Sequence, residues 1–469
     1  MVFTSQVFLF YFLPLVLLGY YALPTRGRNL FLTLASYVFY GWWSPWFVTL
    51  MLASTVIDYA CGRAIAKEGA SERARKTGVF VSIAANLSLL GFFKYFVFAQ
   101  ENLNRLLEIF GSEPTVMLNI VLPVGISFYS FQSMSYSVDL YRGQAQPARS
   151  FLDFACYVAM FPQLVAGPIV RYREIYEQLV ERPQRGELFR LGALNFMTGF
   201  AKKILIANSV GEICDLTFAA GSMPAHAAWF GALAYAFQIY FDFSGYSDMA
   251  IGLGQMFGFQ LPINFRSPYR SESLTEFWRR WHISLSSWLR DYLYIPLGGN
   301  QRGPRITYRN LALTMLLGGL WHGAQWTFLA WGAVHGLVLA LERGLGKRAA
   351  WSSLPRPLRI VLTFTLVLFA WILFRAESLG DAGSYLQAMA LGAGDVRAGT
   401  VLSAQVYQPF YLVAMAAATL LVWFGRETHD WTQQADKRLP FALLTYGLFL
   451  ASIVVMFAQA ENPFLYFQF

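Results

Sequence analysis

The first residue that could carry chemistry is His322, which stands in the apolar stretch LTMLLGGLWHGAQWTF at positions 313 to 328. An imidazole in such surroundings must find a hydrogen-bond partner or lose a few kcal/mol of solvation free energy. Within a membrane, a polar residue of this kind is a functional candidate by default. His322 is therefore the first candidate site residue.

Other polar residues interrupt aromatic sequence. Asp242 and Asp248 lie in YFDFSGYSDMA, where they are either hydrogen-bonded packing groups or the polar lining of a tunnel. His282 lies in WRRWHISLSSW, and a lone histidine at an interface is more often structural than catalytic. The remaining histidines are expected in the core (His335) and in loops or interfaces (His226 and His429).

Several common chemistries lack their motifs here. The chain has no GxSxG elbow, no HExxH and no P-loop. Cys61, Cys156 and Cys214 lie far apart without CxxC spacing, so neither a disulfide framework nor a zinc site is indicated, and we expect no metal. The net charge of +9 is divided among short basic clusters between apolar runs, which argues against a nucleic-acid partner.

Composition places the chain in a membrane. Apolar residues make up 56% of the 469 positions and charged residues only 13%, against about 25% charged in an ordinary soluble chain. The early run SQVFLFYFLPLVLLGYYALP lacks the basic start and the cleavage site of a secretory signal, and it can cross a hydrocarbon core of about 30 Å. We expect a retained first span, with membrane lipid as a partner.

The basic clusters assign a topology under the positive-inside rule. TRGR at 25 to 28, RAIAKEGASERARK at 63 to 76 and RGQAQPAR are placed in the cytoplasm, and WWSPW at 42 to 46 is an outer turn. The pattern predicts about ten transmembrane helices, both termini outside, and a single domain over residues 1–469. Spans are expected at 78–99, 115–141, 191–218, 227–257, 358–376, 409–425 and 440–459.

Two apolar segments break the alternation because basic residues flank both ends. Residues 151–170 are too short to cross twice and include FPQLVAGPIV, whose prolines and glycine break helices, so a re-entrant or interfacial hairpin is expected. Residues 311–341 are either one long tilted helix or two broken half-helices that meet near Gly318, Gly319 and Gly323. Broken helices also suit a transporter or flippase, although no internal repeat is evident.

Residues 264 to 310 are basic, rich in Trp and Tyr, and too polar to span. SLTEFWRRWHISLSSWLRDYL is predicted to form one amphipathic helix at the cytoplasmic interface, with Ser273 and Glu276 as a capping box. Its Arg and Trp residues are either an anchor on lipid head groups or part of a site. The apolar face is expected to contain Phe277, Trp281, Leu285, Trp288 and Leu289.

The long run that begins at YFDFSGYSDMA and continues through LTEFWRRWHISLSSWLRDYLYIPLGGN to GGLWHGAQWTFLAWGAVHG resembles the membrane-bound O-acyltransferase family. The similarity is closest to the bacterial alginate O-acetyltransferase type, and the chain start, FPQLVAGPI and the ending NPFLYFQF also resemble that subgroup. The resemblance implies an all-α polytopic protein with re-entrant and interfacial helices, whose funnel surrounds a tunnel reached by a thioester from one side and a hydroxyl from the other.

The resemblance also implies residue roles. The essential histidine of the family falls on His322 and a second one on His282. A hydroxyl needs a positioned base to attack a thioester, and neutral imidazole suits that task. The side chains expected to contact substrate are Arg279, Arg280, Trp281, Asp242, Trp321 and Arg290. Together with Arg302, the three arginines among them could hold CoA phosphates.

For this subgroup the expected donor is cytoplasmic acetyl-CoA, with no bound cofactor. The acetyl group passes across the bacterial inner membrane to a periplasmic acetyltransferase partner and a polysaccharide synthesis complex. Alginate is the expected polymer. Cellulose or peptidoglycan O-acetylation, teichoic acid D-alanylation, and a transporter or flippase without enzymatic activity remain alternatives. Thioester hydrolysis would separate an acyltransferase from a transporter or a scaffold.

Overall fold

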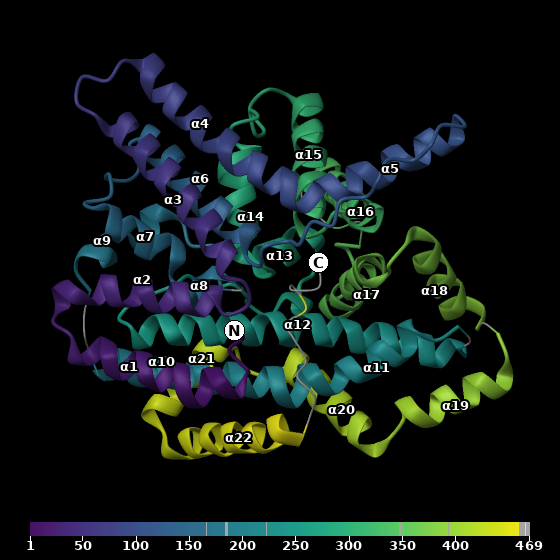
Figure 1. Cartoon of the computed structure of the whole chain (residues 1–469). Helices are drawn as coiled ribbons and strands as arrows, with labels where there is room; N and C mark the ends of the chain where they lie inside the picture. Colours follow the sequence, from purple (N-terminus) through teal and green to yellow (C-terminus); the bar gives the residue numbers. More distant parts are fainter. Residues whose placement is uncertain are drawn as a thin grey trace. The chain divides into compact units, whose positions relative to one another are not determined.

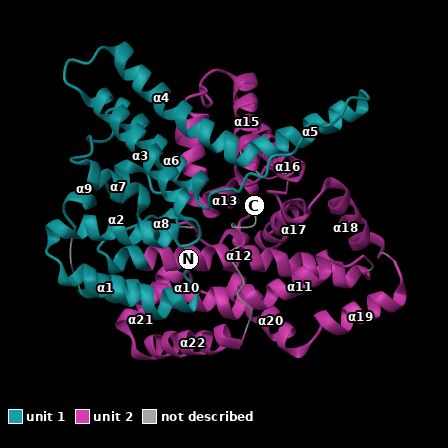
Figure 2. Cartoon of the chain, in the orientation of Figure 1, with its two compact units in different colours: residues 1–192, 253–262 teal, residues 193–252, 263–469 magenta. Residues whose placement is uncertain are grey.

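The computed structural model describes residues 1–165, 167–182, 186–221, 223–346, 349, 351–392, 394–458 and 465 (Figure 1). The protein is 77% helical, and its described residues form no β-strand. The predicted all-α membrane class is confirmed. The chain divides into two compact units, which are residues 1–192 with 253–262 and residues 193–252 with 263–469 (Figure 2).

The first unit contains the N-terminal helices. They are η1 (Phe8–Phe12), α1 (Leu13–Ala22), α2 (Thr25–Gly41), α3 (Pro45–Ala66), α4 (Glu72–Leu90), η2 (Gly91–Tyr95), α5 (Phe96–Ile109), α6 (Ile126–Tyr141), α7 (Phe151–Ala159), α8 (Phe161–Leu164) and α9 (Tyr172–Val180). Polar groups link α3 and α4, because Asp58 on α3 accepts hydrogen bonds from Ser82 and Asn86 on α4, and α6 packs against both helices. The buried carboxylate is thereby compensated by hydrogen bonds.

The predicted hairpin at 151–170 corresponds to α7 and the single turn α8, which are separated at Met160. The residues around the break are buried, and Ser36 accepts a hydrogen bond from the amide of Phe161 at 3.0 Å. Protein groups thus satisfy the backbone at the break, as a non-helical segment at membrane depth requires. Ala166 of FPQLVAGPI lies outside the described residues.

The predicted span at 115–141 is helical only from Ile126 onward. Pro123 and Gly125, whose φ is +79°, stand immediately before α6 and do not continue a helix N-terminally. Side chains of α5 hold the preceding segment instead, and Asn104 bonds both the amide and the carbonyl of Thr115. An apolar run was therefore mistaken for a continuous helix.

The second unit contains the remaining helices. They are α10 (Gly186–Ala201), η3 (Lys202–Ala207), α11 (Asn208–Phe218), α12 (Ala225–Met256), η4 (Pro268–Arg270), α13 (Leu274–Arg280), α14 (Ile283–Leu289), η5 (Arg290–Tyr294), α15 (Pro304–His322), α16 (Trp326–Gly344), α17 (Arg356–Arg375), α18 (Leu379–Leu391), α19 (Val396–Val406), α20 (Pro409–Phe424), α21 (Thr428–Lys437) and α22 (Leu439–Ala458). α10 and α12 begin or end in residues assigned to the first unit. α18, α19 and α21 were not predicted.

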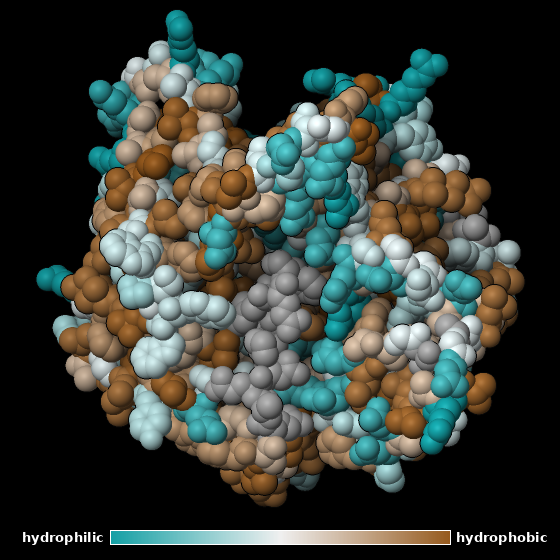
Figure 3. Space-filling model, turned by 45° about the vertical axis from the view of Figure 1, so that its right-hand side comes forward, coloured by the Kyte–Doolittle hydropathy of each residue, from teal (hydrophilic) through white to brown (hydrophobic). Residues whose placement is uncertain are grey.

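Four helical stretches among the described residues are by themselves long and apolar enough to cross a membrane, namely residues 45–66, 72–109, 356–375 and 439–458. A fifth is possible if α19 and α20, which are bent by 67°, form one broken span. The other predicted spans, as far as they are described, do not meet this criterion of length and hydropathy singly. Figure 3 shows apolar side chains over large parts of the visible face, as lipid contact requires.

Candidate active site

His322 is the last residue of α15, and α15 packs closely against α16 through glycine residues. A Cβ atom on Gly319 would overlap the carbonyl oxygen of Phe328, and one on Gly332 would overlap that of Met315. α15 and α16 can therefore approach until their backbones are in contact, as small residues permit between membrane helices. This hairpin fixes where α15 ends and hence where His322 lies.

The segment at 311–341 consists of two helices, so the alternative of two half-helices is confirmed. Their break covers residues 323–325. Of the three glycines expected there, only Gly323 lies at the break, whereas Gly318 and Gly319 lie inside α15. A Cβ atom on Gly323 would overlap the ring of Phe328, so the turn also depends on a residue without a side chain.

His322 is only 4% exposed and is surrounded by aromatic rings. The ring centroids of Trp321, Trp331 and Phe374 lie 5.0, 5.2 and 5.1 Å from that of His322, and all three are in edge-type contact. Trp331 belongs to α16 and Phe374 to α17. Such a site excludes bulk water, which strengthens electrostatic interactions within it.

The predicted continuous helix around His282 is wrong, because the chain breaks between α13 and α14. His282 has a φ of +43°, in the left-handed region that a residue with a side chain rarely adopts. The loop before α13 holds the break, because Arg266 donates its amide to the carbonyl of Arg280 and Ile283 donates its amide to the carbonyl of Asn264. The predicted apolar residues are nevertheless buried.

The side chain of Asn264 orients His282. Its Oδ1 accepts hydrogen bonds from the amide and the hydroxyl of Ser284 at 3.2 and 2.9 Å, and His282 Nδ1 lies 3.2 Å from the same oxygen. Because that oxygen is an acceptor, Nδ1 carries the proton in this contact and Nε2 is the acceptor nitrogen of the neutral ring. Burial lowers the pKa of His282 to about 3, which keeps it neutral.

One tryptophan links the two candidate histidines. The Trp321 ring lies 5.9 Å from the His282 ring and 5.0 Å from the His322 ring, centroid to centroid. The ring of Phe243 on α12 lies 4.6 Å from the His282 ring, centroid to centroid, in an edge-type contact. Residues from α12, from the α13–α14 break and from α15 therefore meet within the second unit.

A buried carboxylate on α16 holds α13 in place. Glu342 is 2% exposed, and its two oxygens accept the backbone amides of Leu274 and Thr275 at 2.7 and 2.8 Å. It thus binds the first amides of α13, which lack partners within the helix. At the same helix start, Ser273 accepts the amide of Glu276, whereas Glu276 accepts the amide of Glu272, so the predicted capping box is only half formed.

The two aspartates of α12 are paired with consecutive lysines. Asp242 forms a buried ion pair with Lys203 and accepts the amide of Leu465 at 2.9 Å. Asp248 pairs with Lys202 at 2.7 Å. Of the ending NPFLYFQF, only Leu465 is described. Asp242 is therefore a buried packing group that is also paired with a cation. Its predicted contact with substrate stays a prediction.

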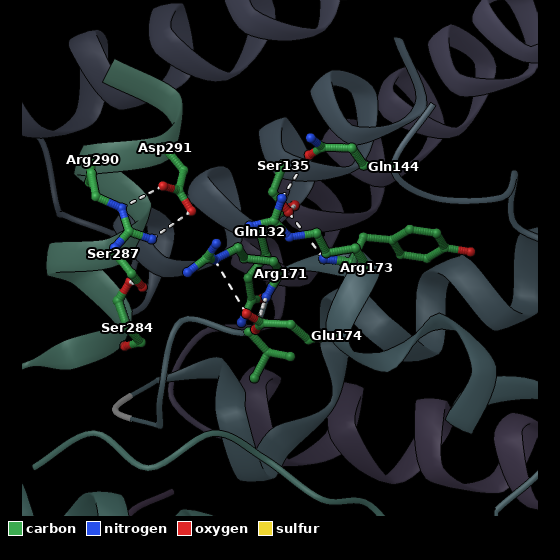
Figure 4. Close-up of polar contacts among 12 residues, drawn as sticks. Gln132, Ser135, Gln144, Arg171, Arg173, Glu174, Ser284, Ser287, Arg290 and Asp291 are labelled. Atoms are coloured by element: carbon green, nitrogen blue, oxygen red, sulfur yellow. Dashed lines mark hydrogen bonds and ion pairs between the residues drawn. The ribbon is translucent and has the colours of Figure 1, made fainter. Parts of the chain in front are cut away.

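Three of the four predicted phosphate-binding arginines, Arg279, Arg280 and Arg290, belong to α13 or to the start of η5 directly after α14. The fourth, Arg302, is exposed in the loop before α15. Arg280 contacts Glu276 at 2.6 Å. Figure 4 shows the other pair, in which Arg290 contacts Asp291 through two hydrogen bonds of 2.6 and 3.2 Å. Arg279 is exposed. These positions are accessible, but two of the four guanidinium groups already face a carboxylate.

Trp281 lies deeper, 1% exposed among aromatic rings that include Phe265 at 5.1 Å and Trp371 at 4.9 Å. His335 is fully buried, in agreement with the predicted core position, and its Nδ1 accepts a hydrogen bond from Trp278. His226 and His429 are exposed, but they lie in the first turns of α12 and α21 and not in loops.

Two neighbours of His322 were missing from the predicted site, Trp331 and Phe374. Trp331 stands nine positions after His322 and comes near it only because the chain reverses at the glycine break. Phe374 belongs to α17, which pairs with α16. The glycine spacing that predicts a chain reversal after His322 could have indicated that Trp331 lies near it. No sequence pattern indicated the position of Phe374.

The model of the MBOAT family, described as membrane-bound O-acyltransferase, matches residues 145–379, a range that contains both His282 and His322. The chain belongs to the membrane-bound O-acyltransferase family. It is accordingly a membrane protein and an acyltransferase enzyme.

Three relatives show how widely this acyltransferase family matches the chain. A protein of Azotobacter vinelandii, named "Probable alginate O-acetylase AlgI", is 46% identical over the full length of both chains. The peptidoglycan O-acetyltransferase of Helicobacter pylori is 38% identical over 83% of this chain and 80% of its own. The teichoic acid D-alanyltransferase of Streptococcus thermophilus is 28% identical over 56% of this chain and 71% of its own.

Proposed function

We propose that this enzyme O-acetylates alginate, taking the acetyl group from cytoplasmic acetyl-CoA and passing it across the bacterial inner membrane to a periplasmic acetyltransferase partner. The full-length similarity to the Azotobacter protein supports the polymer and the acetyl group. The observation that carries the chemistry is the buried imidazole of His322 at the end of α15, within an aromatic enclosure.

His322 acts as the general base. It takes the proton of the acceptor hydroxyl while the hydroxyl oxygen attacks the thioester carbonyl carbon, and a tetrahedral oxyanion forms. When the oxyanion collapses, the carbon–sulfur bond breaks and the proton on the imidazole goes to the departing thiolate. The products are an O-acetyl ester and the free thiol of CoA. A positioned base contributes about 100-fold to 10,000-fold to such a reaction.

Trp331 is placed to stabilise the oxyanion. Its indole nitrogen is buried and has no hydrogen-bond partner among the described residues, and its ring contacts that of His322. An indole N–H is a donor only, so it suits an oxygen that becomes negatively charged. A carbonyl oxygen between Trp331 and His322 would give this donor the partner that a buried polar group needs.

His282 has a supporting role near the same site. Its neutral ring, held by Asn264 and packed against Trp321, presents Nε2 as an acceptor. Such a nitrogen can orient the incoming hydroxyl or the thioester arm. Trp321, whose ring contacts both histidine rings, and Asp242 of α12 are the further proposed substrate contacts.

Arg279, Arg280 and Arg290 would hold the CoA phosphates. Arg280 and Arg290 must then exchange their carboxylate partners for phosphate, which a guanidinium can bind through the same paired geometry. The polar segment stays at the cytoplasmic interface, with both termini in the periplasm. Only the pantetheine arm and the acetyl group need to reach His322.

Replacing His322 by Ala tests the function. The full-length enzyme is reconstituted in vesicles with acetyl-CoA inside and with its partner and polymer outside, and ester formation and thiol release are measured. We expect a loss of about 100-fold or more in rate with unchanged insertion. His226→Ala is the matched control, because that histidine is exposed and lies far along α12 from Asp242.

Acetylation at the normal rate in His322→Ala would refute the base assignment. If the unaltered enzyme transferred acetyl groups to peptidoglycan or another hydroxyl polymer and not to alginate, that polymer would be assigned as the acceptor. The relative from Helicobacter pylori makes peptidoglycan the second candidate. Movement of polymer without thioester cleavage would indicate a transporter.

A further inference from the structure

An apolar cavity of about 400 Å³ lies in the second unit, outside the rings around His322. η3, α12, α20 and α22 contribute to its wall. Leu205, Val413, Ala417 and Leu448 are typical of the lining. The volume falls within the range of about 300–1,000 Å³ that is usual for small-molecule sites.

One end of this cavity is polar. A second cavity of about 290 Å³ shares Lys202, Tyr240, Glu427 and Thr428 with the first, so the two are adjacent. Lys202 contacts Asp248 at 2.7 Å, and Thr428 donates its hydroxyl to the same carboxylate at 2.8 Å. The combined space is therefore apolar at one end and charged at the other.

The charges at the polar end balance. The cations are Lys202, Arg266 and Arg426, and the carboxylates are Asp248, Glu427 and Asp430. Burial raises the pKa of Glu427, an effect that Ser267 and Lys202 partly offset. A ligand with both a cation and an anion would meet an opposite charge at each, whereas an anionic ligand would bring one charge without a partner.

The charged end and the apolar end of the cavity lie at different positions along the candidate membrane helices. α20 ends at Phe424 and α22 begins at Leu439, and three of the six charged residues, Arg426, Glu427 and Asp430, belong to the connection between these ends. Leu448 stands in the middle of α22, the most apolar candidate span, whose Leu450 and Val454 are 63% and 70% exposed. The cavity thus extends from the level of the interface to that of the bilayer centre.

We propose that this cavity binds one zwitterionic phospholipid molecule. The phosphate faces Lys202 and Arg426, the ammonium group faces Asp248 and Glu427, and an acyl chain lies along α20 and α22. The site does not depend on the acyl transfer at His322.

Native mass spectrometry of the purified full-length enzyme tests the site. After delipidation, the protein is titrated with phosphatidylethanolamine and, separately, with anionic phosphatidylglycerol. We expect one tightly bound phosphatidylethanolamine per chain. Ala417→Trp, which fills the cavity, should weaken its binding about tenfold or more. Ala416→Trp is the matched control, because Ala416 is exposed on the same helix and is not part of the lining.

Glu427→Gln tests the charge argument. We expect it to abolish the preference for phosphatidylethanolamine over phosphatidylglycerol, because it removes a partner of the ammonium group. Glu377→Gln, an exposed carboxylate, should leave the preference unchanged. Equal affinity for the two lipids in the unaltered enzyme, or equal binding by the Ala416 and Ala417 variants, would overturn the proposal.

A second measurement does not depend on the folding of the Ala417 variant. Trp431 lines the cavity and donates its indole N–H to Thr445 of α22. The fluorescence of Trp431 is obtained as the difference between the unaltered enzyme and Trp431→Phe. Phosphatidylethanolamine brominated on its acyl chain should quench this difference signal. Absence of quenching of that difference signal at saturating lipid would also overturn the site.

Discussion

At the scale of single residues, the site depends on uncharged polar side chains that are shielded from water. His322 and His282 are buried, and the aromatic neighbour Trp321 connects them. A base needs a lone pair, and an enclosure that disfavours a charge keeps the lone pair available. The catalytic proposal therefore depends on the enclosure as much as on the histidines.

Trp331→Phe should lower kcat by about 100-fold, because it removes the proposed donor to the oxyanion and keeps an aromatic ring. KM for acetyl-CoA should stay within a factor of about two, since the interaction strengthens in the transition state. Steady-state kinetics of thiol release measure both. Trp326→Phe, an exposed tryptophan at the start of α16, serves as the control. A change in KM with kcat intact would assign Trp331 to ground-state binding instead.

His282 should make stability depend on pH in a definite direction. Its pKa is about 3 in the folded protein, against about 6.5 in an unfolded chain, so only the unfolded state binds a proton between these values. The contribution of the neutral His282 to the free energy of unfolding is fully present above pH 6.5. Below that pH it decreases by up to about 1.4 kcal/mol per pH unit until about pH 3. Thermal unfolding of the wild type and of His282→Gln at several pH values should show a shallower decline in the variant. Parallel declines would contradict the prediction.

At the scale of elements, the site is made by breaks in helices. His322 ends α15 and His282 separates α13 from α14, so neither histidine lies in the interior of a helix. Glu342 of α16 binds the start of α13, and this ties one break to the hairpin that contains the other. Helix packing and helix termination together place the two rings.

Gly332→Ala should destabilise the enzyme by about 1–3 kcal/mol, because the added methyl group overlaps the carbonyl oxygen of Met315, and backbone cannot move aside easily. Gly336→Ala is the matched control on the same helix, since its methyl group would come no closer than 3.3 Å to its nearest neighbour, the Cβ atom of Met315. Thermal unfolding in detergent measures the difference. Equal midpoints for the two variants would show that the hairpin can relax.

The sequence predicted the elements better than their breaks. The apolar pattern around Phe277 and Leu285 correctly predicted which residues are buried, although the helix is interrupted at His282. The interruption had no signal, because a positive φ at a histidine is imposed by tertiary contacts such as those of Asn264. The glycines near His322 left two alternatives, one long helix or a break, and packing decided for a break that contains only Gly323.

At the scale of the whole molecule, the family assignment is based on long stretches of similar sequence. The predicted orientation of the chain in the membrane is based only on the distribution of basic residues. The enzyme has helices that can span a membrane among many shorter or broken ones, and hydropathy counts the latter poorly. Contacts between residues far apart in sequence, such as Phe374 with His322, could not be predicted from one chain.

Labelling of cysteines tests the topology. Cys61, Cys156 and Cys214 are buried, so background reaction with a membrane-impermeant maleimide should be low. Trp43→Cys and Ser71→Cys stand at opposite ends of α3, a candidate span. In intact cells with a permeable outer membrane, we expect labelling at position 43 only, and at position 71 only after the inner membrane is opened. Labelling of both in intact cells would refute the assigned orientation.

The position of His322 at the end of α15 has a further consequence for the reaction. The carbonyl groups of the last helical turn point toward the C-terminal end, where they amount to roughly half a negative charge. During acyl transfer the imidazole holds a proton for a short time and becomes a cation in a site without bulk water. The peptide dipoles of α15 would then act as a counter-ion that belongs to the backbone and stabilises the imidazolium while it exists.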